Sequence, residues 1–265
     1  MAQQGKAGIR GEMSRLYDVF VDWPGRLARE MPGIERELNA TGAKRVLDAG
    51  CGTGRHVQAL LERGFDAHGA DVSDEMLAKA RELLGGGERL HAWRMGEAPP
   101  ATLRDASPFD AVICMGNVWP QLSASGDALR AAQAFRELLR PRGLLLVGLK
   151  ALAVRREDKL KYLPLLKRRH EGRALFFARF LDFDVPQPAS GELVCDLHMT
   201  ISAGEPGEEL EALHHGASRV RAWTPEELAR FFAGAGFAEV DVRARLGEPH
   251  SAPTGEDVFV SARSA

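Results

Sequence analysis

The stretch that decides the fold is residues 46–54, VLDAGCGTG, in which three glycines follow a short apolar run. The run Arg45–Ala49 has the composition of a buried strand, and the pattern of residues 52–63 predicts a helix. Glycines at such a turn let the backbone approach a ligand closely, and their N–H groups can bind an anionic group. About 20 residues further on, the next predicted strand ends at Asp71, which is placed to accept hydrogen bonds from ribose hydroxyls.

Outward from this turn, strands and helices alternate as far as Lys150. Predicted strands cover residues 45–49, 67–71, 90–94, 109–115 and 143–149, and predicted helices cover residues 24–39, 52–63, 73–85 and 128–139. Apolar strands that alternate with helices indicate a parallel sheet covered on both faces. The sequence therefore predicts an α/β core.

The pattern changes after Lys150. Residues 174–185, 192–202 and 217–223 are predicted to be antiparallel strands separated by proline and glycine turns. A capping box at residues 224–227, TPEE, then begins another helix. Residues 237–244 and 257–262 are the predicted closing strands, so a small antiparallel layer is inserted into the core.

Composition narrows the function classes. The 265 residues are 45% hydrophobic and 27% charged, which excludes a disordered or fibrous chain. The 37 acidic and 35 basic residues leave a net charge of −2, so the whole protein is not an electrostatic nucleic-acid binder. Three scattered cysteines predict a cytoplasmic location without a disulfide framework. We expect no secretory signal and no membrane contact, because the longest apolar stretch, residues 143–154, is shorter than the ~20 residues of a membrane span.

The glycine spacing separates two kinds of nucleotide-binding fold. A dinucleotide fold has the pattern G-x-G-x-x-G, which would place its third glycine where Arg55 stands. Here Asp48 lies two residues before the first glycine, and a buried acid suits a ligand that carries positive charge. The stretch resembles motif I of the class I S-adenosylmethionine-dependent methyltransferases. That resemblance implies a Rossmann-like sheet, mostly parallel with an antiparallel last strand, and S-adenosyl-L-methionine as the cofactor.

The resemblance also implies a division of the chain and a set of cofactor contacts. It assigns residues 1–42 to N-terminal lid helices, 43–150 to the cofactor-binding core, 151–223 to the inserted antiparallel lid, and 224–265 to the closing helix and strands. In the family, the acid after strand two binds the ribose, and neighbouring residues flank the adenine. The implied cofactor-binding residues are Tyr17, Arg26, Asp48, Ala49, Gly50, Cys51, Gly52, Gly54, Asp71, Val72, Met76, Ala92, Trp93, Met115, Gly116 and Asn117.

A second stretch, residues 109–122, FDAVICMGNVWPQL, is similar to strand four of the glycine/sarcosine N-methyltransferase group. Departures from that group concern the substrate. Trp119 and Gln121 replace smaller or different residues, which implies a pocket of another size or shape. Lys150 stands where the glycine-specific enzymes carry an arginine for the acceptor's carboxylate, so a bulkier amine or amino-acid derivative fits at least as well. No catalytic residue is assigned; the substrate-orienting candidates are Tyr17, Asn117, Gln121 and Lys150.

These features predict methyl transfer to the nitrogen of a small-molecule amine or amino-acid derivative. One alternative is an O-methyltransferase of a natural-product hydroxyl, with His198, His214 or His215 as the base. A second alternative is an RNA- or protein-directed module that uses residues 150–173, which carry nine basic and three acidic residues. A solvated helix over the active site is the simpler interpretation of that segment. We expect no metal site, because the adjacent pair His214 and His215 would point to opposite faces of a strand.

Overall fold

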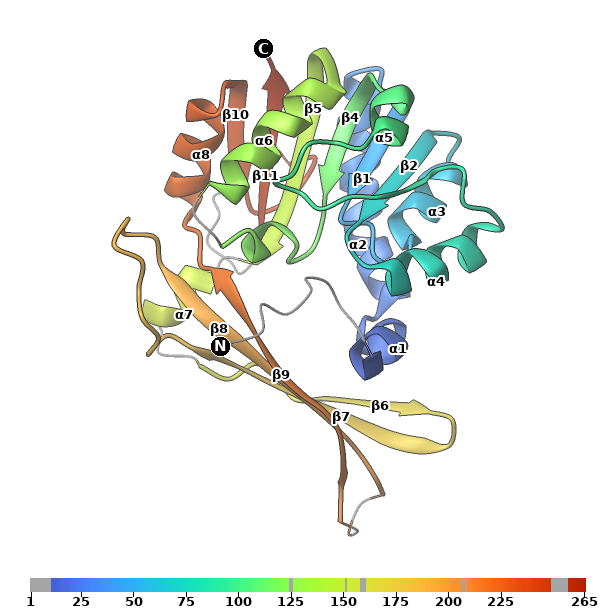
Figure 1. Cartoon of the computed structure of the whole chain (residues 1–265), viewed down its shortest axis with the longest axis vertical. Coiled ribbons are helices and arrows are strands. Elements are labelled where there is room, and N and C mark those ends of the chain that lie inside the picture. Colours follow the sequence, from blue (N-terminus) through green and yellow to red (C-terminus); the bar gives the residue numbers. More distant parts are fainter. Residues whose placement is uncertain are drawn as a thin grey trace.

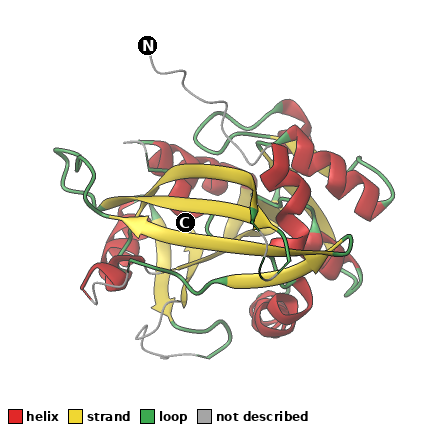
Figure 2. Cartoon of the chain, turned by 90° about the horizontal axis from the view of Figure 1, so that it is seen from below, coloured by secondary structure: helices red, strands yellow, loops and turns green. Residues whose placement is uncertain are grey.

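The chain folds into two separate sheets (Figure 1). The structure, a computed structural model, describes residues 11–123, 126–150, 152–157, 161–205, 207, 209–248 and 257–265. One sheet has seven strands and forms the core, and the other has four strands. The four-stranded sheet lies below the core and spreads across the view from underneath (Figure 2).

The core sheet has the order β10-β11-β5-β4-β1-β2-β3. Five of its strands, β1 to β5, pair in parallel, whereas β11 is antiparallel to both β5 and β10. Its strands are β1 (Arg45–Ala49), β2 (Asp66–Asp71), β3 (Leu90–Ala92), β4 (Phe109–Cys114), β5 (Leu139–Lys150), β10 (Phe237–Arg243) and β11 (Asp257–Ser264). The predicted class, a mostly parallel sheet with an antiparallel last strand, is confirmed.

Alternation along the strands gives the core sheet two buried faces. In β1, Val46 contributes to one apolar cluster and Leu47 to the other, as successive residues on a strand must. The first face packs on α2 (Trp23–Ala40), α3 (Arg55–Leu61) and α4 (Asp74–Leu84), and the second on α6 (Asp127–Leu138) and α8 (Pro225–Gly234). The short helices α5 (Ala101–Ala106) and η1 (Trp119–Gln121) were not expected.

The predicted helix ends are confirmed at two caps. Ser73 precedes α4, and its side chain accepts a hydrogen bond from the Met76 N–H. Thr224 and Glu227 form the complete capping box at the start of α8. Both caps satisfy backbone N–H groups that have no partner inside the helix.

The second sheet is a meander in which β6 (Leu166–His170), β7 (Arg173–Asp182), β8 (Val194–Ala203) and β9 (Glu211–Arg221) pair antiparallel in chain order. Its inner face packs on α1 (Gly11–Phe20), whose Leu16 is buried against Phe177 and Ile201. We propose residues 151–223 as an inserted unit because this sheet shares no strand with the core sheet.

The expectation of a helix over residues 150–173 is wrong. Only the six residues of α7 (Leu152–Glu157) are helical, and β6 is a strand; residues 151 and 158–160 lie outside the described part. The reason is a tight turn at Glu171 and Gly172, which both have positive φ and which join β6 to β7 as a hairpin. Pairing with β7 therefore decides the structure of a segment whose charged residues are compatible with a helix.

Phe135 on α6 is fully buried against Trp93 and Trp119, with ring centroids 6.0 Å apart in both pairs. We expect Phe135→Ala to lower the free energy of unfolding by about 3–5 kcal/mol, because a cavity replaces a packed ring. Urea unfolding followed by circular dichroism measures this. Leu129 on the same helix is 42% exposed, so Leu129→Ala should change the free energy by only about 0.5 kcal/mol. Equal losses in the two variants would contradict the assignment of Phe135 to the core.

Candidate active site

The glycine turn follows the central strand β1 and adopts a backbone that favours glycine. Gly50, Gly52 and Gly54 have φ angles of 85°, 55° and 79°. Side chains are strained at such angles, which explains the three glycines. The Gly52 N–H donates to Asp71 Oδ2 at 2.9 Å, so the turn and the end of β2 are bonded to each other.

Asp71 has both carboxylate oxygens in use at the carboxyl end of β2. Its Oδ1 accepts from the Ser73 N–H at 2.9 Å, while Oδ2 accepts from Gly52. Burial raises the pKa of Asp71, and the backbone donors of Ser73 and Gly52 act in the opposite direction. The carboxylate is thereby oriented at the strand end, where open α/β sheets bind their ligands.

Asp48, at the end of β1, is a buried carboxyl with spare hydrogen-bonding capacity. It is 1% exposed, and among the described residues its Oδ2 has no hydrogen-bond partner. Burial raises its pKa to about 6, although the charges of His56 and Arg26 act to lower it. A buried acceptor without a partner is costly. A ligand that brings an ammonium group would satisfy it.

The helices α1 and α2 lie over this turn, and their role as a lid stays a prediction. The Tyr17 ring covers Gly52, with its Cε1 3.8 Å from where a Cβ on Gly52 would stand. A Cβ on Gly116, just after β4, would lie 2.7 Å from the Arg26 guanidinium. Burial raises the pKa of the Tyr17 hydroxyl, and the adjacent Arg26 charge opposes this. The structure therefore brings Tyr17, Arg26 and Asp48 together at one end of the core sheet.

Three polar residues that the sequence analysis did not select, Asp18, Glu30 and His56, connect these helices to the core. Asp18 Oδ1 accepts from Thr53 Oγ1 at 2.7 Å and from Trp23 Nε1 at 2.8 Å. Glu30 binds Arg26 Nε at 3.0 Å and lies 2.8 Å from His56 Nε2. The Arg26–Glu30 spacing of four residues on one helix was a readable signal. The contacts of Asp18 and His56 join distant segments, which no local pattern reveals.

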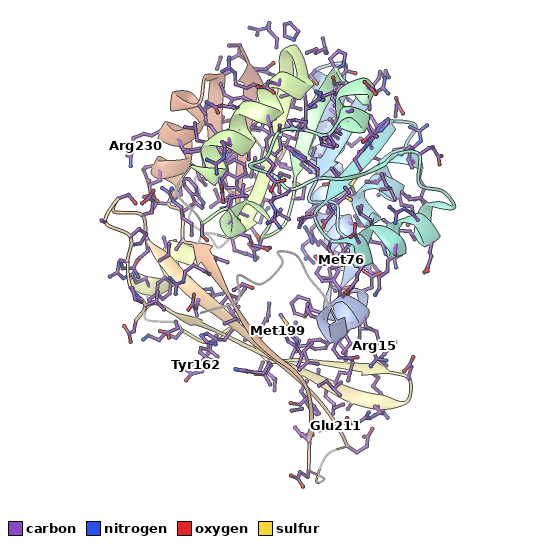
Figure 3. The ribbon with its side chains drawn as sticks, in the orientation of Figure 1. Arg15, Met76, Tyr162, Met199, Glu211 and Arg230 are labelled. Carbon is purple, nitrogen blue, oxygen red and sulfur yellow. The ribbon has the colours of Figure 1, made fainter. Side chains whose placement is uncertain are left out.

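Around the adenine region the predicted residues divide into two groups. Met76 is buried beneath α1, with its Sδ 3.9 Å from Ser14 Oγ (Figure 3). Ala92 is exposed at the end of β3 beside Asp71, and Val72 is partly exposed. Trp93 instead points into the core, where its Nε1 donates to the Glu97 carbonyl at 3.1 Å.

Residues after β4 are hydrogen-bonded to each other and to the last residue of β5. Asn117 Oδ1 accepts from the Lys150 N–H at 3.0 Å, and the Asn117 carbonyl accepts from Gln121 Nε2 at 2.9 Å. The Lys150 ammonium lies 2.7 Å from Asp257 Oδ1 on β11. Lys150 is therefore neutralised within the chain, which weakens its case as the holder of a substrate carboxylate.

Trp119 does not line a pocket. It is fully buried and packs on Phe135, Phe231 and Phe232, at centroid distances of 5.0–6.0 Å. The expectation that Trp119 reshapes the substrate pocket is wrong, because α6 and α8 provide an aromatic core that accepts the ring. Met115 is also buried, with its Cε against Gly148 and 2.8 Å from a Cβ built there. Ala49 and Cys51 are buried in the two core clusters.

The histidines considered as bases lie on the four-stranded sheet. His198 stacks on Phe180 with ring centroids 4.3 Å apart, and His215 is hydrogen-bonded to Thr200 at 3.1 Å. His214 lies opposite Ile201 on the neighbouring strand. In the described ranges, no cluster of three or more His, Cys, Asp or Glu side chains could hold a metal ion. No described helix has the length and apolar character needed to cross a membrane.

Comparison with known proteins defines the class. Residues 46–143 match a family described as a methyltransferase domain. A solved sugar N-methyltransferase from a Streptoalloteichus species has a TM-score of 0.71 at 20% identity, covering 100% of this chain and 97% of that one. An S-adenosylmethionine-dependent methyltransferase from Clostridium acetobutylicum has a TM-score of 0.69 at 14% identity, with 95% and 96% covered. The chain thus has the fold of the class I S-adenosylmethionine-dependent methyltransferases, and residues 46–143 match a methyltransferase domain.

Curated relatives are similar over part of their length. The glycine/sarcosine N-methyltransferase of Halorhodospira halochloris is 40% identical over 133 residues, which are 49% of this chain and 49% of that protein. The glycine N-methyltransferase of Rattus norvegicus is 34% identical over 149 residues, which are 52% and 51%. The chain spans about half the length of the curated relatives it matches. These findings confirm the predicted resemblance and S-adenosyl-L-methionine as the cofactor of the class.

Burial of Asp48 makes the stability of the cofactor-free protein depend on pH. Its pKa is about 6 when folded, against an ordinary value of 3.8. The folded state therefore binds the proton more tightly, and the free energy of unfolding should fall by about 2 kcal/mol as the pH rises from about 4 to about 6, out of about 3 kcal/mol over the whole titration. Asp48→Asn should remove this fall, as measured by urea unfolding across that range. The exposed Asp74→Asn serves as the control and should follow the wild type; parallel curves for Asp48→Asn and wild type would refute the prediction.

Proposed function

We propose that this protein is an S-adenosylmethionine-dependent methyltransferase that methylates the nitrogen of a small-molecule amine or amino-acid derivative. The observation that carries the proposal is the arrangement around the glycine turn. Three features lie together at the carboxyl end of the core sheet. They are the oriented carboxylate of Asp71, the buried Asp48 with an unpartnered oxygen, and the Arg26 guanidinium over Gly116. The similarity to glycine/sarcosine N-methyltransferases supports nitrogen as the acceptor atom.

Each group of the cofactor has a complementary residue in this arrangement. Asp71 would accept hydrogen bonds from the ribose hydroxyls, as acids at this position do in related folds. The unpaired Asp48 oxygen would meet the ammonium of the methionine part, and Arg26 would bind its carboxylate through charge-assisted hydrogen bonds. Met76 and Val72 would border the adenine. Tyr17 would close the turn from above, because its ring already covers Gly52.

The main contribution of the protein to the reaction would be to align the acceptor amine with the methyl group. When bound, the cofactor supplies a methyl group made electrophilic by the sulfonium. The amine lone pair must lie in line with the C–S bond at about 3–3.5 Å, and such alignment can supply roughly 7–11 kcal/mol of the barrier. The new N–C bond forms as the C–S bond breaks, and the product amine gives its extra proton to water. Helix α1 and the four-stranded sheet would exclude water from the proposed site. The acceptor amine would then stay neutral, because desolvation disfavours its charged form.

No specific observation among the described residues supports either alternative acceptor. His198 is stacked on Phe180 at the sheet, so a base for an O-methyltransferase is not aimed at the glycine turn by any described contact. The basic segment is divided between α7 and β6 and does not form one continuous helix. Both alternatives are outcomes of the assay below.

Asp71→Asn should weaken the affinity for S-adenosylhomocysteine by at least about tenfold, because it removes charge-assisted hydrogen bonds worth about 1.5–3 kcal/mol. Titration calorimetry measures this, with Asp74→Asn as a control expected to stay within about twofold. In parallel, mass spectrometry follows methyl transfer to glycine, sarcosine, larger amines, phenols and RNA. Methylation of phenols or RNA alone would reject the proposed acceptor, and a wild-type protein that does not bind the cofactor would reject the function altogether.

A protonated amine has no lone pair with which to attack. The rate of methyl transfer should therefore rise with pH through the pKa of the bound amine and then level off. Single-turnover rates measured from pH 6 to pH 9 test this. A kinetic isotope effect with S-adenosylmethionine that carries a deuterated methyl group establishes that methyl transfer is the rate-limiting step. A flat profile under those conditions would contradict attack by an amine that must first lose its proton.

A further inference from the structure

Arg179 lies among apolar residues on the inner face of the four-stranded sheet. Along β7, side chains on one face recur every second residue. Phe177 on this face packs on α1, and Leu181 packs with Leu152 of α7. Arg179 lies midway between them, so its side chain is on the inner face between the two helices. Met199, its neighbour on β8, is on the same face, whereas Tyr162 lies on the other side of the sheet (Figure 3).

Arg179 is a half-buried cation without a counter-ion in the described part of the chain. Its guanidinium carbon lies 5.0 Å from the Phe20 ring centre, and its Nε is buried without a hydrogen-bond partner. The one hydrogen bond described for it is a long contact of 3.5 Å to the Pro164 carbonyl. No described Asp or Glu forms an ion pair with it. Charged groups in partly buried, apolar surroundings are normally paired. An anion bound beside Arg179 would therefore be stabilised.

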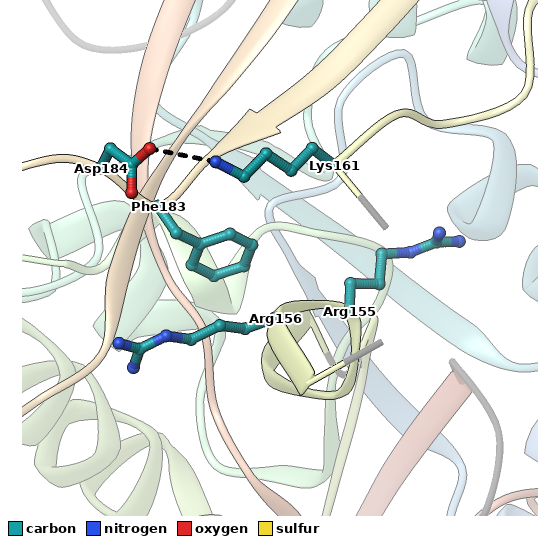
Figure 4. Close-up of a pocket in the computed structure, with 5 residues that line it drawn as sticks. All are labelled: Arg155, Arg156, Lys161, Phe183 and Asp184. Atoms are coloured by element: carbon teal, nitrogen blue, oxygen red, sulfur yellow. Dashed lines mark hydrogen bonds and ion pairs between the residues drawn. The ribbon is translucent and has the colours of Figure 1, made fainter. Parts of the chain in front are cut away.

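A second cation strengthens the electrostatic attraction for an anion beside Arg179. Arg155 of α7 is 8% exposed, and burial together with its charge lowers the pKa of Arg179. Arg155 and Arg156 leave α7 in opposite directions, and both border a cavity with Phe183 and the Lys161–Asp184 ion pair (Figure 4). Arg155 has interactions of its own. The unpaired positive charge therefore resides on Arg179.

Helix α1 connects this arginine to the glycine turn. Phe20, which contacts Arg179, is three residues from Tyr17, which covers Gly52. Residues three apart on a helix have Cβ atoms about 5–6 Å from each other on the same side. Arg179 is thus within about one helical turn of the residue that closes the proposed cofactor site. Lys150, the candidate suggested by the resemblance, is instead paired with Asp257.

We propose that Arg179 binds an anionic group of the methyl acceptor, a carboxylate or a phosphate, and so selects amines that carry one. The inference rests on the proposed methyltransferase function. Arg155 adds positive potential beside Arg179, and Phe20 supports the guanidinium plane. The acceptor's amine then extends along α1 toward Tyr17 and the glycine turn.

Pairs of acceptors that differ in the presence of an anionic group test this proposal. Methyl transfer is measured for glycine against methylamine and for O-phosphoethanolamine against ethanolamine. The wild type should favour the anionic member of one pair at least about tenfold in kcat/KM, and that pair identifies the anion as carboxylate or phosphate. Arg179→Gln should abolish the preference mainly through KM, and Arg179→Lys should restore part of it. Arg219→Gln, on the opposite face of the same sheet and paired with Asp196, is the matched control and should match the wild type.

A binding measurement does not depend on turnover. Calorimetry of acetate and inorganic phosphate with the S-adenosylhomocysteine complex should detect one anion, with affinity at least about tenfold lower in Arg179→Gln. Cofactor affinity should be the same in all variants. If the wild-type complex binds neither anion, or if Arg179→Gln binds it as well as the wild type, the inference is overturned. Failure to bind S-adenosylhomocysteine would overturn the proposed function instead.

Discussion

Burial of a carboxyl at the end of the central strand is the constraint around which the site is organised. Among the described residues, Asp48 lies beneath the glycine turn with one oxygen unpaired, and Arg26 and His56 act to lower its pKa without bonding that oxygen. Glu30 contacts both Arg26 and His56, so helix α2 and the core helix α3 meet at one polar network. A cationic ligand group that paired with this oxygen would stabilise the proposed site, since an unpaired buried charge is costly.

The lid helix α1 links the two sheets. Through Tyr17 and Asp18 it contacts the glycine turn, and through Leu16 and Phe20 it contacts the four-stranded sheet. Both sets of contacts therefore lie on one helix of 10 residues. This arrangement would let a sheet that shares no strand with the core contribute to the proposed site, because the proposed acceptor contact and the proposed cofactor contact lie on one element.

Similarity to known enzymes covers the cofactor-binding part far better than the part that would recognise the acceptor. The matched domain ends at residue 143, before α7 and all four strands of the second sheet. The methyltransferase class is therefore well supported, whereas the acceptor has to be argued from this chain's own residues. Arg179 and Arg155 both lie beyond the matched domain.

By itself the sequence determined the alternating core, the glycine turn, the two helix caps and the acids at the ends of β1 and β2, because these depend on local backbone preferences and short spacings. Only the tertiary structure decided where Trp119 and Trp93 point, that β6 is a strand, and that Lys150 is neutralised by Asp257. It alone also left Arg179 without a counter-ion. Each of these outcomes results from contacts between segments far apart in the chain, and burial and charge pairing are properties of the assembled fold that no local pattern contains.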